Sequence, residues 1–259
     1  MRNLEQYLAS AVDLILPERC PSCGAITRSA QGGFCADCWQ RLHFLAPPWC
    51  AGCALPFGHD QGDHALCANC LDKPPLHDGV RAAVAYDEIS RKVALRLKYG
   101  GKIGLARMIA TQLVRHLPED HSNVLVTPVP LHRTRLWQRT FNQSALIARA
   151  LCDLRSVQYA PDILVRNRST PSLKGLSGKE RERTVRNAFA IHPRWQERVK
   201  GARILLVDDV LTSGATSNAC IRMLKKGGAE WVQLFCWARV LPGEAMPDRS
   251  MVGLDVALD

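Results

Sequence analysis

The sequence contains no long hydrophobic run, since its uncharged apolar stretches are much shorter than the ~18 residues that a membrane-spanning helix needs. The N-terminus also lacks the basic segment followed by an apolar segment that marks a secretory signal peptide. We therefore expect a cytoplasmic protein without a membrane span. No Walker run (G-x-x-x-x-G-K-S/T), no dinucleotide-binding run (G-x-G-x-x-G) and no recognised DNA-reading motif is present.

Acidic residues are few relative to basic ones, with 24 Asp and Glu against 34 Lys and Arg and a formal net charge of +10. The charge is unevenly distributed, because residues 1–79 carry −3 and residues 80–259 carry +13. The length of 259 residues and the 47% hydrophobic content suit a soluble globular protein with one sizeable core and a small additional module. A basic half suits a pyrophosphate-bearing ligand, a nucleic-acid backbone or both, and a solvated basic surface is the alternative.

Cysteine is concentrated near the N-terminus, where eight of the eleven cysteines form four C-x-x-C pairs separated by spacers of 11, 11 and 13 residues. Two thiolates at this spacing face one ion, and a spacer of this length returns a second pair to complete a tetrahedral set. Disulfides are disfavoured without a secretory signal, and redox chemistry does not need four pairs. The predicted ligands of two structural Zn²⁺ ions are Cys20, Cys23, Cys35, Cys38, Cys50, Cys53, Cys67 and Cys70.

Sequential pairing, first pair with second and third with fourth, is the arrangement we predict for these cysteines, and a crossed RING-like arrangement is the alternative. His43, His59 and His64 are expected at the surface, because the cysteines already fill two sites. Each Zn²⁺ with four thiolates carries −2, which makes the acidic module more acidic. We therefore expect the module to support folding or partner docking rather than DNA binding.

Four regions follow from these patterns. Residues 1–17 form an amphipathic helix whose apolar face packs on the protein rather than on a membrane, residues 18–73 form a double zinc ribbon, residues 80–241 form an α/β domain, and residues 242–259 form a tail. In the α/β domain, strands alternate with helices, which predicts a mostly parallel sheet. The expected strands and helices lie at 80–86, 89–99, 103–117, 124–129, 144–154, 162–165, 204–207, 217–226 and 231–238, the last of which is expected to close the sheet. The three remaining cysteines, Cys152, Cys220 and Cys236, are expected to be buried.

The most informative stretch is 203–216, in which an apolar strand leads to two aspartates, a Thr/Ser/Gly loop and a helix. Loop N–H groups and a helix N-terminus suit a phosphate at Thr212 to Thr216, whereas Asp208 and Asp209 suit sugar hydroxyls. The alternative is a strand followed by a capped turn. The run resembles the phosphoribosyl pyrophosphate (PRPP) loop of type I phosphoribosyltransferases and departs from it at Ser213, where Thr is usual. The resemblance implies ligand contacts from Asp208, Asp209, Val210, Leu211, Thr212, Ser213, Gly214, Ala215 and Thr216.

Two further basic stretches are candidates for anion contacts. In related phosphoribosyltransferases, the loop after the early strand meets pyrophosphate, which here is 128–135. The long polar segment 166–186 is expected to be a lid or binding loop. The candidate cations for pyrophosphate or DNA are Arg133, Arg135, Arg139, Arg166, Arg168, Lys174, Lys179 and Arg181.

The run Pro-Val-Pro-Leu at 128–131, with Phe-Asn-Gln at 141–143, resembles the competence protein F (ComF) family, as do Leu-Lys-Tyr at 97–99, the cysteine pairs and the PRPP loop. Members pair a double zinc ribbon with a phosphoribosyltransferase-like domain, so the resemblance implies this fold. The sequence departs from the family at Thr140, where Gly is usual, at Leu173, where Gln is expected, and at Thr184, where Asn is expected. Thr does not easily take the positive φ that Gly allows.

The resemblance implies a PRPP-binding protein, with Mg²⁺ accompanying PRPP, that acts in DNA uptake during natural transformation or in the use of external DNA. Single-stranded DNA would bind the basic domain, where Trp137, Phe141 or Trp195 offers stacking or belongs to the core, and the zinc module would dock a DNA-translocating helicase. The alternative is a phosphoribosyltransferase enzyme that acts on an unidentified acceptor and has no direct role with DNA. The sequence identifies no acceptor pocket and no catalytic residue.

Overall fold

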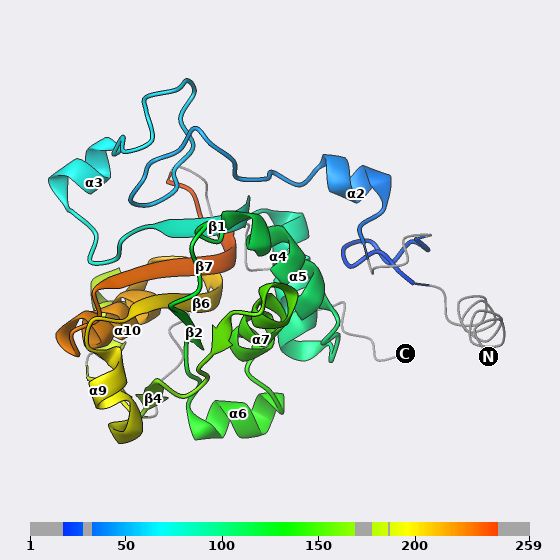
Figure 1. Ribbon diagram of the computed structural model, residues 1–259. Helices are drawn as coiled ribbons and strands as arrows, with labels where there is room; N and C mark the ends of the chain where they lie inside the picture. The colour runs from blue at the N-terminus through cyan, green and yellow to red at the C-terminus, as the bar shows by residue number, and fades with distance from the viewer. Residues whose placement is uncertain (1–17, 28–32, 169–177, 186, 243–259) are drawn as a thin grey trace.

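The computed structural model describes residues 18–27, 33–168, 178–185 and 187–242 (Figure 1). We call residues 18–72 the ribbon region and residues 80–242 the sheet domain. None of the helices in the described ranges is long and apolar enough to cross a membrane. The helices and strands, in chain order, are α2 (Ala36–Gln40), α3 (Ala68–Asp72), β1 (Val80–Ala85), α4 (Glu88–Tyr99), α5 (Leu105–Leu113), η1 (Val114–His116), β2 (Val124–Pro128), α6 (Arg133–Arg139), α7 (Gln143–Arg155), β3 (Gln158–Tyr159), β4 (Leu164–Arg166), α8 (Gly178–Val185), β5 (Phe189–Ile191), η2 (Pro193–Trp195), α9 (Gln196–Val199), β6 (Arg203–Leu211), α10 (Ala215–Lys226) and β7 (Trp231–Arg239).

The sheet domain is organised around a five-stranded parallel sheet with the strand order β1-β7-β6-β2-β3. The prediction of a mostly parallel α/β sheet is therefore confirmed. The expectation that residues 231–238 close the sheet is wrong, because β7 lies between β1 and β6 and pairs with both, through Leu234 for example. Eight of the nine residues of β7 are buried, which suits an internal strand covered on both faces.

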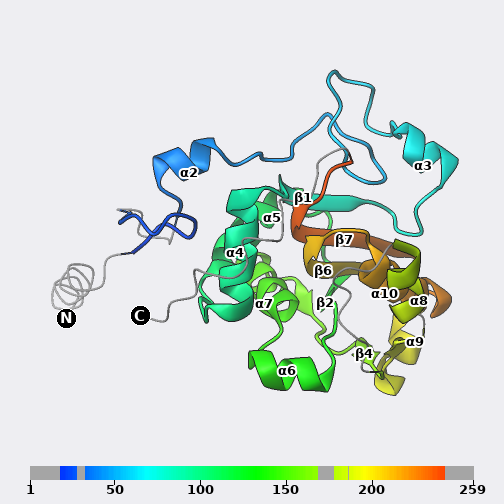
Figure 2. The same ribbon diagram turned by 180° about the vertical axis from the view of Figure 1, so that it is seen from behind.

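Helices cover both faces of this sheet (Figures 1 and 2). One face packs against α4, α5 and α7, and the other packs against α10 and the two-stranded antiparallel β4-β5 unit. Side chains of β6 alternate between them, since Leu205 and Val207 join the first core whereas Ile204 and Leu206 join the second. Cys152 is buried in the first core and Cys220 in the second, and Cys236 is buried in a smaller cluster with Leu45 and Ala82, so all three are buried as expected.

The chain that links the two cysteine groups covers the outer edge of β1. The Leu45 N–H donates to the Ala83 carbonyl at 3.1 Å, and the Ala85 N–H donates to the His43 carbonyl at 2.8 Å. These bonds form an antiparallel bridge that satisfies backbone groups on an edge otherwise open to pairing with other chains.

The ribbon region also contributes to the core of the sheet domain. The Phe34 ring stacks on Trp237 of β7, with centroids 6.4 Å apart and an interplanar angle of 10°. Arg96 of α4 donates to the Cys20 carbonyl at 3.2 Å. Cys20 and Cys38 belong to the same buried cluster as Trp237. The first cysteine group is thus attached to the sheet through shared apolar contacts.

The connections between strands reverse direction between β2 and β6. From β2 the chain passes through α7 to β3 on one side, whereas from β6 it passes through α10 to β7 on the other. In open parallel sheets, such a reversal leaves a crevice at the carboxyl ends of the two strands, and ligands bind there. The last β2-β6 pair joins Pro128 to Val207, so Asp208 lies at this crevice.

Candidate phosphoribosyl site and zinc centres

The cysteines of the ribbon region converge in two groups, and within each group the four Sγ atoms all lie within 4.8 Å of one another. The Sγ–Sγ distances of Cys23 to Cys35 and of Cys53 to Cys67 are both 3.6 Å. Four sulfurs bound at about 2.3 Å around tetrahedral Zn²⁺ lie about 3.8 Å apart, so each group fits one structural Zn²⁺ ion. The groups are Cys20, Cys23, Cys35 and Cys38, and Cys50, Cys53, Cys67 and Cys70, which is the sequential pairing and not the crossed one.

Both groups are built on the same turn after the first C-x-x-C pair. The Gly24 N–H donates to the Cys20 carbonyl at 3.0 Å, and the Ala54 N–H donates to the Cys50 carbonyl at 2.8 Å. Gly24 has φ 80° and Ala54 has φ 57°, so both turns need the left-handed conformation although only one has glycine there. The ribbon region is therefore an internal structural repeat.

The thiol of Cys50 lies among backbone donors. The N–H groups of Cys53 and Cys67 lie 3.5 and 3.2 Å from its Sγ. Burial opposes ionisation, but these donors lower the pKa of Cys50 to about 7. A thiolate held in this way is the form that binds Zn²⁺. The three histidines of the region, His43, His59 and His64, are exposed and lie outside both groups.

In the sheet domain, the PRPP-loop stretch begins inside a strand. The sequence predicted that the aspartates follow the strand, but β6 continues through Leu211 because it still pairs with β7 after its pairing with β2 has ended. Thr212 and Ser213 are then exposed, Gly214 has φ 71°, and α10 begins at Ala215. Among the described residues, no side chain caps α10. The first-turn N–H groups of an uncapped helix carry partial positive charge and are open to an anion.

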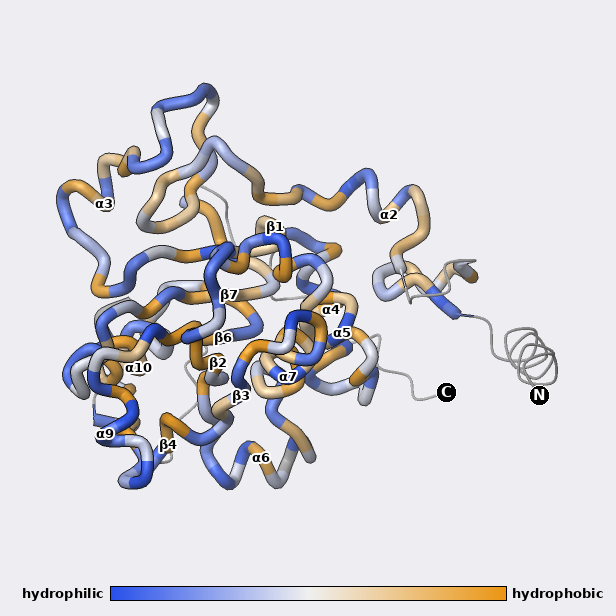
Figure 3. The backbone as a smooth tube through the Cα atoms, viewed as in Figure 1, coloured by the Kyte–Doolittle hydropathy of each residue, from blue (hydrophilic) through white to orange (hydrophobic). Residues whose placement is uncertain are grey.

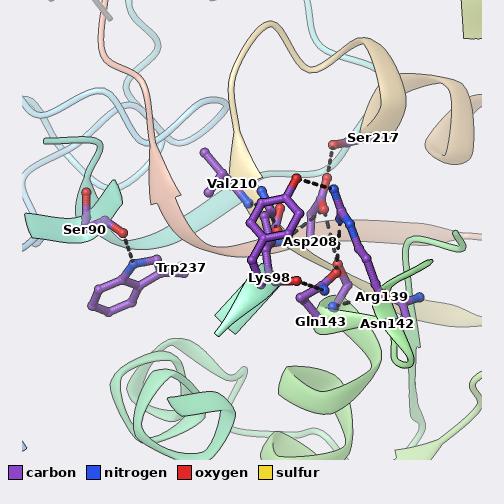
Figure 4. A network of polar contacts seen from close by, with 12 residues as sticks. Ser90, Lys98, Arg139, Asn142, Gln143, Asp208, Val210, Ser217 and Trp237 are labelled. Carbon is purple, nitrogen blue, oxygen red and sulfur yellow. Dashed lines mark hydrogen bonds and ion pairs between the residues drawn. The ribbon is translucent and has the colours of Figure 1, made fainter. Parts of the chain in front are cut away.

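Asp208 is held by hydroxyl and backbone donors at the crevice (Figure 4). Its Oδ1 accepts hydrogen bonds from Ser144 of α7 at 3.3 Å and from the Asp209 N–H at 2.9 Å, and its Oδ2 accepts one from Ser217 of α10 at 3.1 Å. Burial, and then the charge of Asp209, raise the pKa of Asp208 to about 7. Asp208 therefore joins helices from both faces of the sheet.

Asp209 forms an ion pair with a lysine from a distant part of the chain. Its Oδ2 lies 2.7 Å from Nζ of Lys98, at the end of α4, and its Oδ1 accepts the Val210 N–H at 2.7 Å. The side chains of Lys98 and Asp209 are only 22% and 14% exposed. Burial opposes the charge on Lys98, but the carboxylates of Asp209 and Asp208 raise its pKa above the usual value. The lysine thus offsets the acidic charge where an anion is expected.

The last residue of α6 and the residues that follow it contact the neighbourhood of Lys98 and the two aspartates. Arg139 donates to the Tyr99 hydroxyl at 3.0 Å and lies 3.4 Å from the Gln143 side-chain oxygen, and its guanidinium lies over the Tyr99 ring at 5.1 Å. Gln143 in turn lies 3.5 Å from the Lys98 carbonyl, and Asn142 donates to the Val129 carbonyl at 3.0 Å. Three separate stretches of the sequence therefore form one network around the aspartates (Figure 4).

The Arg-rich stretch after β2 was expected to be a turn, but residues Arg133–Arg139 form the helix α6. Its Leu136 side chain is 41% exposed and its Trp137 side chain is 92% exposed, and Figure 3 shows hydrophobic and hydrophilic positions mixed along α6. Burial, and then the charge of Arg135, lower the pKa of Arg166 on β4. Arg135 and Arg166, one from each of the two basic stretches, are thus near each other. Phe141 is half-buried, whereas Trp195 is buried and donates to Asp162 at 3.1 Å.

Thr140 ends α6 with φ 67°, in the left-handed conformation. The residue adopts the backbone that glycine would favour, at a steric cost for a β-branched side chain. Thr184, in place of the expected Asn, donates its hydroxyl to the Glu180 carbonyl of its own helix at 2.7 Å.

Part of the predicted lid lies outside the described residues. Lys174, Leu173 and Thr170 belong to 169–177, and the side chains of Lys179 and Arg181 on α8 are not described. Within the described ranges, Arg133 and Arg168 are exposed.

Sequence reasoning did not include Lys98, Ser144 and Ser217 among the site residues. Lys98 is 111 positions away from Asp209 in the sequence, so no local pattern connects them. Two sequence signals could have pointed to these residues. Lys98 lies within the Leu-Lys-Tyr run and Ser144 directly follows the Phe-Asn-Gln run, and both runs resemble the ComF family.

Comparison with known families and proteins agrees with this arrangement. Residues 11–71 match the double zinc ribbon domain model, and residues 147–256 match the phosphoribosyl transferase domain model. Competence protein F of Haemophilus influenzae is 30% identical over 85% of this chain and 96% of its own length, and DNA utilization protein YhgH of Escherichia coli is 30% identical over 88% of this chain and 100% of its own. Competence protein ComFC of Streptococcus pneumoniae is 24% identical over 83% of this chain and 91% of its own.

Two solved structures share a weaker likeness. Glutamine PRPP amidotransferase from B. subtilis has a TM-score of 0.37 and 20% identity, with 55% of this chain and 30% of that chain covered. Hypoxanthine phosphoribosyltransferase from Trypanosoma cruzi has a TM-score of 0.32 and 15% identity, with 61% of this chain and 73% of that chain covered. These scores add nothing to the assignment.

The paired four-cysteine groups and the parallel sheet with its crevice at β2 and β6 define a protein that joins a double zinc ribbon to a phosphoribosyltransferase domain. Relatives that match this chain along nearly their whole length make the assignment specific. The chain belongs to the ComF family.

Proposed function

We propose that the protein binds PRPP, or a related phosphoribosyl ligand, at the carboxyl end of β6. The observation that carries the proposal is the uncapped N-terminus of α10, which directly follows Gly214 in the left-handed conformation and the exposed Thr212 and Ser213. A 5′-phosphate in this loop accepts hydrogen bonds from first-turn N–H groups and meets the positive end of the helix dipole. The ribose then lies toward Asp208 and Asp209.

Lys98 has a defined part in this proposal. The carboxylate oxygens of Asp208 and Asp209 already accept from donors within the protein, and the Lys98 ammonium lies 2.7 Å from Asp209, so a second cation bound directly to the pair is disfavoured by charge repulsion. We therefore assign to Mg²⁺ only the neutralisation of the pyrophosphate group that it accompanies. Sugar hydroxyls replace Lys98 at Asp209, and the freed ammonium pairs with a phosphate oxygen of the ligand.

We further propose that the protein acts in DNA uptake or in the use of external DNA, a proposal supported by relatives that are named a competence protein and a DNA utilization protein. Single-stranded DNA binds along α6, where Arg133 and the 92% exposed Trp137 offer a phosphate contact and a stacking surface. The ribbon region docks a protein partner such as a DNA-translocating helicase, and the exposed Ile26, Trp39 and Leu71 are its apolar contacts.

Calorimetric titration of the full chain with PRPP and Mg²⁺ tests the proposal. Replacement of Asp208 and Asp209 by Ala should abolish binding, whereas Asp153→Ala on the exposed side of α7 should leave it unchanged. Wild-type affinity in the double variant would show that the loop is structural.

Titration in the presence of single-stranded DNA separates the two functions. Weakened PRPP affinity with DNA present would indicate that both ligands share the crevice. PRPP binding without any DNA binding favours the second candidate, a phosphoribosyltransferase that acts on an unidentified acceptor, which the complete PRPP-loop run also supports.

A further inference from the structure

A cavity of about 390 Å³ lies between the ribbon region and the sheet domain, away from the PRPP loop. Pro47 and Trp49, from the chain that links the two cysteine groups, form one wall, and Arg81 of β1 with Arg115 and His116 of η1 forms the other. Figure 1 shows this linking chain between α2 and α3, passing over the β1 edge of the sheet. β1 is separated from β6 by β7, so the cavity is distinct from the site at β6.

The lining of this cavity is positively charged. Arg81 and Arg115 line it, no acidic residue does, and neither arginine forms an ion pair within the described ranges. Burial, and then the charges of Arg115 and Arg81, lower the pKa of His116 to about 4, so the imidazole is neutral near pH 7. Burial also lowers the pKa values of both arginines, which reflects a desolvation cost that a bound anion would offset.

Aromatic rings hold the two guanidinium groups by their faces. The guanidinium carbon of Arg81 lies 5.0 Å from the centroid of the Trp49 ring, and that of Arg115 lies 5.5 Å from the centroid of the Phe44 ring. A cation–π contact of this kind uses the charge of the guanidinium and not its N–H hydrogen bonds, so these donors can serve other partners. Arg81 uses one of them for the Val80 carbonyl at 2.7 Å, and Arg115 uses its Nε for His116 at 3.3 Å. Most of the five donors of each arginine remain for a ligand.

The two arginines are not equivalent. Arg81 is only partly exposed, and it already donates to the Val80 carbonyl of its own strand. Arg115 lies at the mouth of the cavity and is more exposed than Arg81, so a ligand reaches it first. Arg115 is therefore the main ligand contact, and Arg81 is the supporting one.

We propose that this cavity binds a phosphate group, carried by a nucleotide or by the backbone of a nucleic-acid strand, with Arg115 as its principal donor. The oxygens of a phosphate match the planar fork of a guanidinium, which favours phosphate over a simple halide. The volume is within the range of about 300–1,000 Å³ that is usual for small-molecule sites and accommodates one nucleotide. The inference goes beyond the proposed function, because it needs neither PRPP nor the loop at β6.

The test uses the full, zinc-loaded chain with Asp208 and Asp209 both replaced by Ala, which removes the ribose contacts of the loop site, so that the loss of affinity caused by a change at Arg115 reports the cavity. Inorganic phosphate, 5′-dAMP and an oligothymidylate are titrated separately by calorimetry. Arg115→Ala should weaken binding of the probe that binds best by about tenfold or more, since hydrogen bonds to charged groups contribute about 1.5–3 kcal/mol. Arg115→Lys keeps the positive charge but loses the planar fork of the guanidinium. The affinity of this variant should therefore lie between those of the Arg115→Ala variant and the chain that retains Arg115.

Arg107→Ala is the matched control, because Arg107 is an exposed arginine of α5 outside the cavity and should leave affinity unchanged. Equal binding of phosphate and 5′-dAMP, both weakened by Arg115→Ala, would identify the phosphate group as sufficient. Binding of the oligonucleotide alone would identify a strand at the cavity if Arg115→Ala weakens it, since binding along α6 does not depend on Arg115. Equal weakening in the Arg107 and Arg115 variants, or no binding of any probe to the loop-deficient chain, would overturn the proposal. Zinc content measured for every variant ensures that the cavity wall is intact.

Discussion

The ribbon region has two five-residue helices and isolated bridges, whereas the sheet domain has nine-residue strands at its centre and helices on both faces. The first carries acidic formal charge and the second basic charge. The two regions also differ in the interactions that hold their side chains in place. Thiolates converge on metal sites in one, and apolar side chains alternate between two cores in the other. The ribbon region nevertheless contributes Phe34 and Leu42 to the core of the sheet domain, so a metal-organised unit can stabilise a fold that does not itself bind the metal.

Zinc removal should have the largest effect, and it tests directly whether the metal sites of the ribbon region also stabilise the sheet domain. The protein should contain two zinc ions per chain, and chelation should unfold the ribbon region because little apolar surface is buried within it alone. Since Phe34 stacks on Trp237 and Leu45 pairs with β1, the melting temperature of the sheet domain should also fall. Elemental analysis and hydrogen exchange measure the zinc content and the unfolding, and calorimetry measures the melting temperature.

Cysteine variants provide the control for zinc. Cys23→Ser should reduce the zinc content to one ion, whereas Cys152→Ser, at a buried cysteine outside both groups, should leave it at two. Fewer than two zinc ions in fully loaded wild-type protein, or unchanged exchange of the ribbon region after chelation, would contradict the prediction.

Lys98→Met should have the next largest effect, which is on PRPP affinity. It tests the role of the lysine beside Asp208 and Asp209, two acidic residues in an otherwise basic domain. Without the ammonium 2.7 Å from Asp209, the carboxylates repel the phosphates of PRPP, which should weaken binding by about tenfold or more at the effective dielectric of a partly buried site. Lys92→Met, on the same helix with an exposed Glu88 partner, should change affinity little. Stronger PRPP binding in the Lys98 variant would mean that the lysine competes with the ligand instead of assisting it.

Removal of positive charge should show which of the two regions binds single-stranded DNA. Arg133→Ala combined with Arg168→Ala should flatten the salt dependence of single-stranded DNA binding, by about 0.7 in the slope of log affinity against log salt for each phosphate that is no longer neutralised. Arg41→Ala in the ribbon region, combined with Lys73→Ala directly after it, removes the same charge and should leave the slope unchanged. If the second pair flattens the slope and the first does not, DNA binds the acidic region, and the charge argument is wrong.

Local patterns predicted much of both regions. The C-x-x-C spacing led to the two cysteine groups, and the run 203–216 led to a strand, loop and helix at the crevice, because each depends on residues close together in sequence. The pair of Lys98 with Asp209 and the stacking of Phe34 on Trp237 were not predicted, since each joins residues that only the tertiary fold brings together. The position of β7 inside the sheet was missed for the same reason.

Helix α6 was missed for a different physical reason. Its seven residues are mostly charged or polar, and its two large apolar side chains, Leu136 and Trp137, are both exposed. A helix without a buried stripe has no apolar period for a sequence pattern to detect. The His132 side chain, which accepts the Thr134 N–H at 3.3 Å, caps the helix and is an unusual start signal.

Asp208→Asn should change the pH dependence of stability in the sheet domain. Burial and the charge of Asp209 raise the pKa of Asp208 from 3.8 to about 7, so the folded state retains a proton that the unfolded chain has already released between these values. The stability contributed by this proton is full below the lower value and is lost as pH rises through the upper one. The variant should therefore gain stability relative to wild type as pH rises across this interval, as urea denaturation measures. A difference that does not change with pH would show that Asp208 is ionised throughout.

Thr140→Gly should have the smallest effect, and it compares the left-handed turns of the two regions. The ribbon region has Gly24 at φ 80°, whereas the sheet domain has a β-branched residue at φ 67°, which ends α6 beside the proposed phosphoribosyl site. Left-handed backbone costs a non-glycine residue about 1–2 kcal/mol, and the greater entropy of glycine in the unfolded chain offsets part of this gain. The variant should therefore be more stable by about 1 kcal/mol or less, seen as a higher urea midpoint. Thr111→Gly, inside helix α5, supplies the opposite control, because glycine in a helix interior should lower the midpoint. A lower midpoint for both variants would mean that the Thr140 side chain stabilises the junction of α6 and α7 by more than its backbone conformation costs.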